Sequence, residues 1–448
     1  MPSHPVSTTP NLAKPPELLS TLPLGLSRAA RHAADQPISG LIKLALEDPG
    51  IISLAAGLVD YDTLPGDEVA PLLQSLLEDD SAARAALQYG TTEGYAGFRE
   101  ALYRHLAGLE GCTAEQMPGS AEDVVVTTGS QQLLHTLADV LLDEGDIVIS
   151  GWPSYFVYTS ALTQFGATIR AIDLDQDGMV PDKLERLLKG LHAAGQLTRV
   201  KMLYLVSYHQ NPTGITLSPE RRPQILDLVR RYSELAGQRI VLVEDAAYRE
   251  LTYEGEPPPS IKSYDTSNQF VALCQTFSKP YAPGLKTGYG LLPTDLVEPV
   301  KLSKGGRDFG SSNFCHHLLH RALETGVYDR HVELLKQAYA VKLHATLEAL
   351  EEHFGGMEGA TWTKANGGMY VWLTLPEIDT TREGPLFTHA IEQGMLFVPG
   401  KFCYPTDPTR TPPTDTIRLA VGVPTVDQIR EGIARLARAV EAVEARDH

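Results

Sequence analysis

Cysteine is scarce in this chain of 448 residues. The four cysteines, Cys112, Cys274, Cys315 and Cys403, stand far apart and form no C-x-x-C pair. This spacing argues against a zinc ribbon and against a disulfide framework, and it favours a reducing compartment. We therefore expect the protein to work in the cytoplasm.

Long apolar runs and an excess of positive charge are missing as well. No run approaches the roughly 18 apolar residues that a membrane-spanning helix needs. Residues 1–16, MPSHPVSTTPNLAKPP, hold no apolar segment behind a basic start, so no secretory signal is expected. The net charge of −18 argues against nucleic acid, because a phosphate backbone requires a basic surface. We expect neither a membrane nor a nucleic acid as partner.

The sequence does contain short apolar runs that alternate with amphipathic segments. The runs are β-branched and bounded by turn residues, as is typical of buried strands, and they span residues 124–126, 147–149, 202–206 and 240–243. Helical patterns lie between them at residues 131–142, 181–191 and 219–235. This alternation predicts a parallel sheet with helices on both faces.

The pattern changes near Gly326, where a smaller α+β domain is predicted to begin. Residues 328–354 read as one long helix, residues 369–373, 396–399 and 416–420 as strands, and residues 426–446 as a closing helix. We predict a flexible arm over residues 1–25 and an N-terminal segment over 26–60 that packs on the small domain and the active site. The large domain would span residues 61–325 and the small domain 326–448.

The loop after the first central strand offers a place for an anion. Residues 124–132 read V-V-V-T-T-G-S-Q-Q, so a strand leads into a glycine and small polar residues that open a helix. Free backbone N–H groups and the helix dipole make such a place attractive to phosphate. Alternatively, Ser130 is a plain helix N-cap.

Two further motifs follow later strands. The segment H-Q-N-P-T-G, residues 209–214, forms a turn where α/β proteins place ligands, unless Asn211 merely caps its own backbone. In V-L-V-E-D-A-A-Y, residues 241–248, Asp245 ends an apolar strand, and a carboxylate there needs a partner such as a heteroaromatic N–H⁺. Tyr248 can face the same site. The alternative for Asp245 is a helix cap.

The last motif is a lysine in Q-T-F-S-K-P-Y-A-P-G-L-K-T-G-Y-G, residues 275–290. A partly buried Lys279 would lose proton affinity and could form a Schiff base with an aldehyde. A lone loop lysine is more often simply solvated. Together, however, the four motifs provide a phosphate cradle, a pyridinium partner, a phenol partner and an amine, which is the set that pyridoxal 5′-phosphate (PLP) requires.

On these motifs the sequence resembles the fold-type I PLP enzymes, and among them the class I and II aminotransferases of the kynurenine and 2-aminoadipate branch. The resemblance runs from about Ile51 to the C-terminal helix. It implies an α/β fold with a mostly parallel seven-stranded sheet, flanked by helices, and a smaller α+β C-terminal domain.

The resemblance also implies roles for the residues around the cofactor. Lys279 would carry the Schiff base and move a proton between the substrate α-carbon and the cofactor, and Asp245 would hold the pyridine nitrogen protonated. Tyr248 and Asn211 would bind the phenolic oxygen, and Tyr155 would stack on the ring. The residues implied at the phosphate are Ser130, Gln131, Thr276, Ser278 and Lys286.

Substrate and subunit contacts follow from the same resemblance. Arg418 would bind the substrate carboxylate with its guanidinium fork, and Asn211 and Gly57 would lie beside the substrate. The alternative for Arg418 is a surface ion pair. Tyr89 would reach the phosphate from the partner subunit, so we expect a homodimer with shared sites.

Two positions depart from the family pattern. Lys286 stands where arginine is usual, and Gly151 stands where glutamate is usual. A lysine still neutralises phosphate, but as a point charge without the fork. Both departures suggest a site reshaped for something other than the common amino acids.

Transamination of an L-amino acid to a 2-oxo acid is the default activity for this resemblance. The alternative is other PLP chemistry in specialised metabolism, namely elimination, replacement, cyclisation or oxidation. A PLP-binding transcription factor would need a basic DNA-reading domain, and residues 1–50 show few basic residues and no helix-turn-helix pattern. A metal site is not expected, because His135, His209, His316 and His317 lack ligand spacing.

Overall fold

The computed structural model describes residues 50–445 and, before them, residues 25–27, 30–31, 40–41, 43–44 and 47–48. The predicted arm over residues 1–25 lies, apart from residue 25, outside these described residues. Of the predicted N-terminal segment, residues 50–60 are described without a gap.

The larger sheet has eight strands within the described ranges, in the order β2-β9-β8-β7-β6-β3-β4-β5. The neighbours from β8 to β4 run parallel, whereas β9 is antiparallel to both of its neighbours and β5 is antiparallel to β4. The strands are β2 (Val124–Thr127), β3 (Ile147–Trp152), β4 (Thr168–Asp175), β5 (Gly178–Met179), β6 (Val200–Val206), β7 (Val241–Asp245), β8 (Val271–Thr276) and β9 (Gly288–Leu291).

The predicted fold class is confirmed, but the predicted count of seven strands was one too low. The additional strand is β5, which has only two residues and pairs with the end of β4 after a tight turn. Two residues are too few to show a period of alternating side chains, so the sequence carries no strand signal there.

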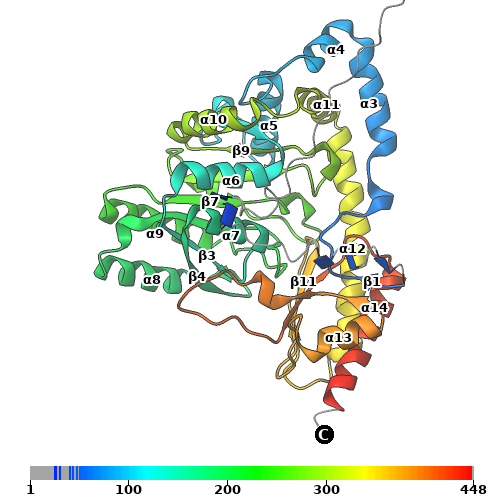
Figure 1. Ribbon diagram of the computed structural model, residues 1–448. Coiled ribbons are helices and arrows are strands. Elements are labelled where there is room, and N and C mark those ends of the chain that lie inside the picture. Colours follow the sequence, from blue (N-terminus) through cyan, green and yellow to red (C-terminus); the bar gives the residue numbers. More distant parts are fainter. Residues whose placement is uncertain are drawn as a thin grey trace, which may run out of the picture.

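Helices cover both faces of the large sheet (Figure 1). The alternation of strand side chains explains why. In β2, Val125 packs in the cluster that contains α6, whereas Val124 and Val126 pack in the cluster that contains α5 and α11. The helices are α5 (Ala96–Leu109), α6 (Gly129–Leu141), α7 (Phe156–Leu162), α8 (Pro181–Ala193), α9 (Arg221–Ala236), α10 (Thr294–Asp308) and α11 (Asn313–Glu324).

A second sheet of four short strands forms the other core of the described chain. Its order is β10-β11-β14-β13 and all of its pairs are antiparallel. Beside it, β1 pairs with β12 in parallel. The elements are β1 (Ile52–Ser53), β10 (Thr361–Trp362), β11 (Tyr370–Thr374), α13 (Pro385–Glu392), β12 (Met395–Leu396), β13 (Val398–Pro399), β14 (Thr416–Ala420) and α14 (Val426–Glu444).

The closing helix α14 begins where its sequence provides a capping box. Thr425 Oγ1 accepts a hydrogen bond from Gln428 N, and the Gln428 side chain accepts one from Thr425 N. Its apolar stripe, which includes Ile429, Ile433 and Leu436, is buried against the small sheet.

The long helix α12 (Val327–Phe354) joins the two cores and runs beside α3 (Gly66–Glu78), which α4 (Asp80–Leu87) follows (Figure 1). Its residues up to Tyr339 pack with the large sheet, whereas Leu343 and those after it pack with the small sheet. The change of core thus falls inside the helix. The domain boundary at residues 325 and 326 stays a prediction.

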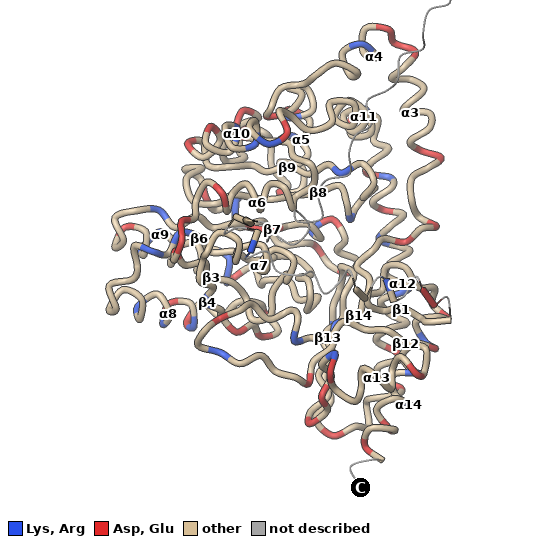
Figure 2. Tube along the Cα trace, in the orientation of Figure 1, with Lys and Arg blue, Asp and Glu red and all other residues tan. Residues whose placement is uncertain are grey.

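Charged residues are spread over the outer elements. Figure 2 shows Lys and Arg lying among Asp and Glu on α8, α9 and α10. No helix in the part of the chain that the structure describes is both long and apolar enough to cross a membrane.

Candidate active site

One cavity of about 260 Å³ opens where the strands of the large sheet end. The strands β2, β3, β6, β7 and β8 all point the same way, so their carboxyl ends meet at this edge, where open α/β sheets bind ligands. Ten residues that the sequence singled out line this one cavity: Ser130, Gln131, Tyr155, Asn211, Asp245, Tyr248, Thr276, Ser278, Lys279 and Lys286.

The first turn of α6 forms the anion end of the cavity. The helix begins at Gly129, and its N-cap is Thr128 without a side-chain cap bond, so the alternative of Ser130 as N-cap is wrong. Gly288 allows β9 to approach closely, because a Cβ there would overlap the backbone nitrogen of Ser130. Free N–H groups at a helix start favour a phosphate.

Hydroxyl groups and a cation complete this end. Ser278 N donates to Thr276 Oγ1 at 3.1 Å, and the two hydroxyl oxygens lie 3.0 Å apart. Lys286 follows a short 3-10 helix (Pro283–Leu285) in a left-handed conformation with φ of 49°. The donors and the positive charge together fit a phosphate group.

A second layer of side chains, which the sequence did not reveal, supports the start of α6. Gln132 Oε1 accepts from Thr128 N at 2.7 Å, and Gln132 Nε2 donates to Asp308 Oδ2 at 2.7 Å. The buried Lys304 donates to the same carboxylate at 3.0 Å. The end of α10 therefore holds the anion-binding turn. Gln132 belongs to the motif at residues 124–132, but its partner Asp308 is so distant in the sequence that no local pattern connects the two residues.

Asp245 lies at the end of β7 and is almost fully buried. Its Oδ2 accepts from the Tyr204 hydroxyl at 3.0 Å and its Oδ1 from Ala247 N at 3.2 Å. Burial raises the pKa of this carboxyl to about 6. A neighbouring cation would offset that burial cost, which is what a protonated pyridine nitrogen provides.

Tyr204 was missed because it sits within an apolar strand and reads as core. The register pairs Tyr204 with Val243, so Asp245 is two residues beyond on the adjacent strand and on the same face of the sheet. This parallel register was a signal that could have found it.

Two tyrosines line the cavity between Asp245 and the small sheet. Burial raises the pKa of both the Tyr155 and the Tyr248 phenols, so both keep their protons and can donate hydrogen bonds. The Tyr248 oxygen lies 3.3 Å from the oxygen of Tyr370, another residue that the sequence did not single out.

Lys279 follows β8 and points toward the N-terminal segment. Its Nζ donates to the carbonyl oxygen of Gly57 at 2.8 Å. This contact brings Gly57, a predicted substrate neighbour, to the amine. An amine in this place can reach an aldehyde in the cavity.

Arg418 reaches the same region from β14 in the small sheet. Its Nη1 donates to Asn211 Oδ1 at 3.0 Å and its Nη2 to the carbonyl oxygen of Ala55 at 2.7 Å. The guanidinium is 4.7 Å from the Tyr370 ring centroid and 5.4 Å from that of Phe156. Since only 2 % of Arg418 is exposed, the alternative of a surface ion pair is wrong.

The turn at residues 209–214, which carries Asn211, begins with a buried histidine, His209. His209 Nε2 lies 2.8 Å from Thr252 Oγ1, and its Nδ1 lies 3.2 Å from Thr216 Oγ1. Burial lowers the pKa of His209 to about 3, so the ring is neutral at ordinary pH. Among the described residues, no group of three or more His, Cys, Asp and Glu side chains is arranged to hold a metal ion.

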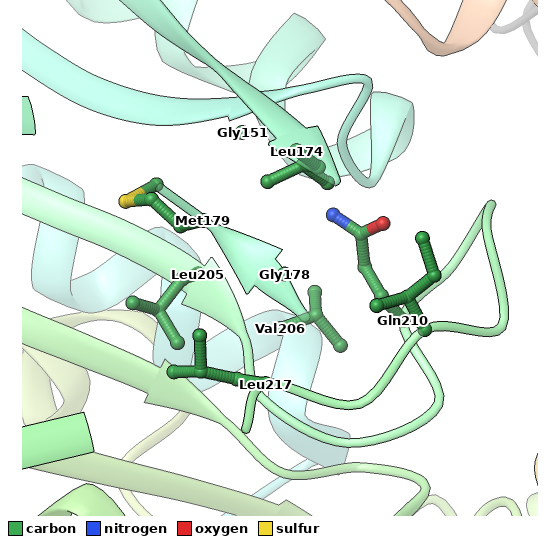
Figure 3. A pocket seen from close by; sticks show the side chains of 9 residues that line it. Gly151, Leu174, Gly178, Met179, Leu205, Val206, Gln210 and Leu217 are labelled. Atoms are coloured by element: carbon green, nitrogen blue, oxygen red, sulfur yellow. The ribbon is translucent and has the colours of Figure 1, made fainter. Parts of the chain in front are cut away.

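Gly151 and Tyr89 lie apart from the active-site cavity. Gly151 lines a separate cavity of about 10 Å³, into which the Gln210 amide points (Figure 3). A Cβ there would lie 2.9 Å from the Pro153 oxygen, so local packing favours a glycine at this position. Tyr89 is 83 % exposed and lines another cavity, together with Phe309 and Ser311.

Comparison with known proteins links this geometry to a family. The family described as aminotransferase class I and II matches residues 49–436. The chain is 33 % identical over 405 residues to an aromatic-amino-acid aminotransferase of Thermococcus litoralis, which covers 90 % of this chain and 91 % of that protein. It is 31 % identical to a 2-aminoadipate transaminase of Thermus thermophilus, over 91 % of this chain and 94 % of that protein.

A solved structure has the same architecture. The crystal structure of the kynurenine aminotransferase of Pyrococcus horikoshii, in complex with PMP, superposes with a TM-score of 0.84 at 33 % identity. The match covers 94 % of this chain and 97 % of that chain.

Proposed function

Because the chain belongs to the class I and II aminotransferase family and is a PLP-dependent transaminase, we propose that its amino donor is an aromatic or 2-aminoadipate-like L-amino acid. The support is that the similar enzymes are named for aromatic amino acids, 2-aminoadipate and kynurenine. The acceptor is a 2-oxo acid. None of these observations supports the alternative of elimination, replacement, cyclisation or oxidation.

The proposed roles follow from the contacts in the cavity. Bound PLP supplies a cationic ring that stabilises negative charge at the substrate α-carbon. Lys279 Nζ binds the cofactor aldehyde and moves the α-proton. Asp245 holds the ring nitrogen protonated, while Tyr248 and Asn211 donate to the phenolic oxygen and Tyr155 covers the ring.

The remaining residues bind the two charged ends. We assign the phosphate to the first turn of α6 and the side chains after β8, that is to Ser130, Gln131, Thr276, Ser278 and Lys286. Arg418 binds the substrate carboxylate beside Asn211 and Gly57. The observation that carries this assignment is the 3.0 Å contact between Arg418 and Asn211, because it joins the carboxylate-binding group of one sheet to the cofactor cavity of the other.

A spectrum of the PLP-loaded protein tests the central role of Lys279. We expect a visible absorption band in the wild type and in Lys364→Ala, an exposed-lysine control. Borohydride should abolish this band and leave the cofactor covalently attached to the protein. Lys279→Ala should lose this covalent attachment, and an aromatic amino acid alone should release one oxo acid per site from the wild type. Covalent attachment that persists in Lys279→Ala would overturn the assignment.

We further propose a homodimer in which Tyr89 completes the partner's phosphate site. Large apolar side chains that line the same cavity as Tyr89 are exposed, namely Leu87 at 70 % and Phe309 at 64 %. Ser311 in this cavity lies 3.4 Å from Thr128 at the anion end, so a second copy seated here would lie close to the phosphate. We propose the cytoplasm as the location, for which the four free cysteines are the support.

Mixed dimers test whether Tyr89 acts across the interface. Lys279→Ala alone should inactivate the enzyme, and Tyr89→Ala alone should weaken it. If Tyr89 serves the partner, a mixed dimer contains one site with both native residues, so activity should return as subunits exchange. If Tyr89 serves its own subunit, each site keeps one defect and mixing restores nothing.

A further inference from the structure

Tyr370 is a buried tyrosine at the junction of the two sheets. It begins β11, is 1 % exposed, and does not line the active-site cavity. Its hydroxyl oxygen lies 3.3 Å from that of Tyr248, and the two rings meet edge to face with centroids 5.7 Å apart. The Arg418 guanidinium lies over its ring.

The same hydroxyl lies against the segment that receives Lys279. A Cβ on Gly57 would overlap the Tyr370 oxygen, and the Gly57 carbonyl is the acceptor of the Lys279 amine. Tyr370 therefore contacts three groups to which the proposed function gives a task, and it does not itself line the cavity that would hold the cofactor. That makes it a positioning residue.

The proton count decides which tyrosine donates. Each phenol carries one proton and can accept through its oxygen. If Tyr248 gives its proton to the phenolic oxygen of the cofactor, the contact at 3.3 Å can form only with Tyr370 as donor. A hydrogen bond received by Tyr248 polarises its own O–H and strengthens its donation.

We propose that Tyr370 donates a hydrogen bond to Tyr248 and thereby directs the Tyr248 proton to the phenolic oxygen of PLP. This inference rests on the proposed role of Tyr248. A stronger donor at the phenolic oxygen withdraws negative charge from it. The nearby nitrogen of cofactor-bound Lys279 then holds its proton less tightly, so loss of the donor raises the pH at which that nitrogen titrates.

The titratable groups near Tyr370 could also affect the titration on which the test depends. They are Tyr248, Tyr155, Tyr339 and Arg418, with Lys279 reached through Gly57. The three other phenols are buried and their pKa values lie above the ordinary value, so they stay neutral through the titration.

The experiment is a pH titration of the visible band of the PLP-loaded protein without substrate. Tyr370→Phe keeps the ring under Arg418 and removes only the hydroxyl. We expect its midpoint to rise by a few tenths to about one pH unit, the equivalent of one ordinary hydrogen bond. Tyr248→Phe should raise the midpoint further, and Tyr103→Phe, which removes a buried hydroxyl far from the cavity, should leave it unchanged.

The double variant separates this inference from the function on which it rests. Tyr248→Phe/Tyr370→Phe should titrate like Tyr248→Phe alone, because Tyr370 acts through Tyr248. If Tyr248→Phe itself causes no shift, the proposed role of Tyr248 fails. If Tyr248→Phe shifts the midpoint but Tyr370→Phe does not, or if the two shifts add, the inference about Tyr370 is wrong.

Discussion

At the anion end the cavity is lined by backbone N–H groups from the first turn of α6 and by short hydroxyl side chains and Lys286 from the segment after β8. At the opposite end they are buried side chains that meet from two sheets, with Asp245 from one and Arg418 from the other. The anion end also borders the exposed surface that carries Tyr89, whereas Arg418 at the ring end lies against the buried rings of Tyr370 and Phe156.

This difference indicates that the two ends of the cavity have different functions. Under the proposed assignment, groups at the anion end bind a part of the cofactor that does not react, so changes there should mainly alter cofactor retention. Under the same assignment, groups at the ring end contact atoms whose charge changes during the reaction, so changes there should mainly alter the rate. Substitutions at each end should therefore have different effects on cofactor retention and on rate.

Asp245→Asn should cause the largest effect. The amide cannot balance a protonated ring nitrogen, so the ring withdraws electrons less strongly from the α-carbon. We expect kcat to fall roughly 10²- to 10³-fold, as for loss of a strong electrostatic group in other active sites, while PLP still binds through its phosphate. Single-turnover kinetics at saturating PLP measure this, and a loss of less than about tenfold would contradict the comparison.

Arg418→Lys tests the substrate side of the same end. A lysine keeps the charge but cannot contact Asn211, Ala55 and a carboxylate with one planar fork. We expect kcat/KM to fall about 10- to 100-fold, the value of one charge-assisted hydrogen bond, mostly through KM. Arg410→Lys, at a cation that pairs with Asp173 outside the cavity, is the matched control.

The buried carboxylate should also cost stability when the cofactor is absent. Burial raises the pKa of Asp245 from its ordinary 3.8 to about 6, so the unfolded chain ionises first as the pH rises. Stability is therefore lost between about pH 4 and pH 6, by up to ~3 kcal/mol in the PLP-free protein. Denaturant unfolding of wild type and Asp245→Asn at pH 4.5 and 7.5 measures it, and Asp182→Asn is the exposed control.

The two ends also differ in how much the sequence reveals. The residues of the anion end stand in contiguous motifs, so Ser130 could be proposed from the strand-glycine-helix pattern alone, whereas Ser278 and Lys286 were assigned to the phosphate from the resemblance. The ring end depends on contacts between distant segments. Tyr204 and Tyr370 each lie in an apolar strand whose pattern indicates only burial, and their partners become visible only from strand register and from the packing of one sheet against the other.

Gln132→Met should weaken the anion end without changing the chemistry. The substitution removes both hydrogen bonds of the amide, to Thr128 and to Asp308, and frees the first turn of α6. Two ordinary hydrogen bonds correspond to about a tenfold loss or more of PLP affinity. We expect kcat at saturating PLP to stay within about twofold because no ring contact changes. Gln74→Met, at an exposed position of α3, is the control, and a large fall in kcat in Gln132→Met would contradict this expectation.

Lys286→Arg should have the smallest effect, and it tests whether the unusual lysine matters. The residue already has a left-handed backbone that fixes the direction of its side chain, so a longer guanidinium has little freedom to adjust. A bidentate contact to phosphate favours arginine, but under the proposed assignment the helix N-terminus and the hydroxyl groups also bind that anion. We therefore expect PLP to dissociate no more than about threefold more slowly, as judged by competition with a PLP-free acceptor enzyme. A change of more than tenfold would mean that Lys286, and not the backbone of α6, dominates the anion end.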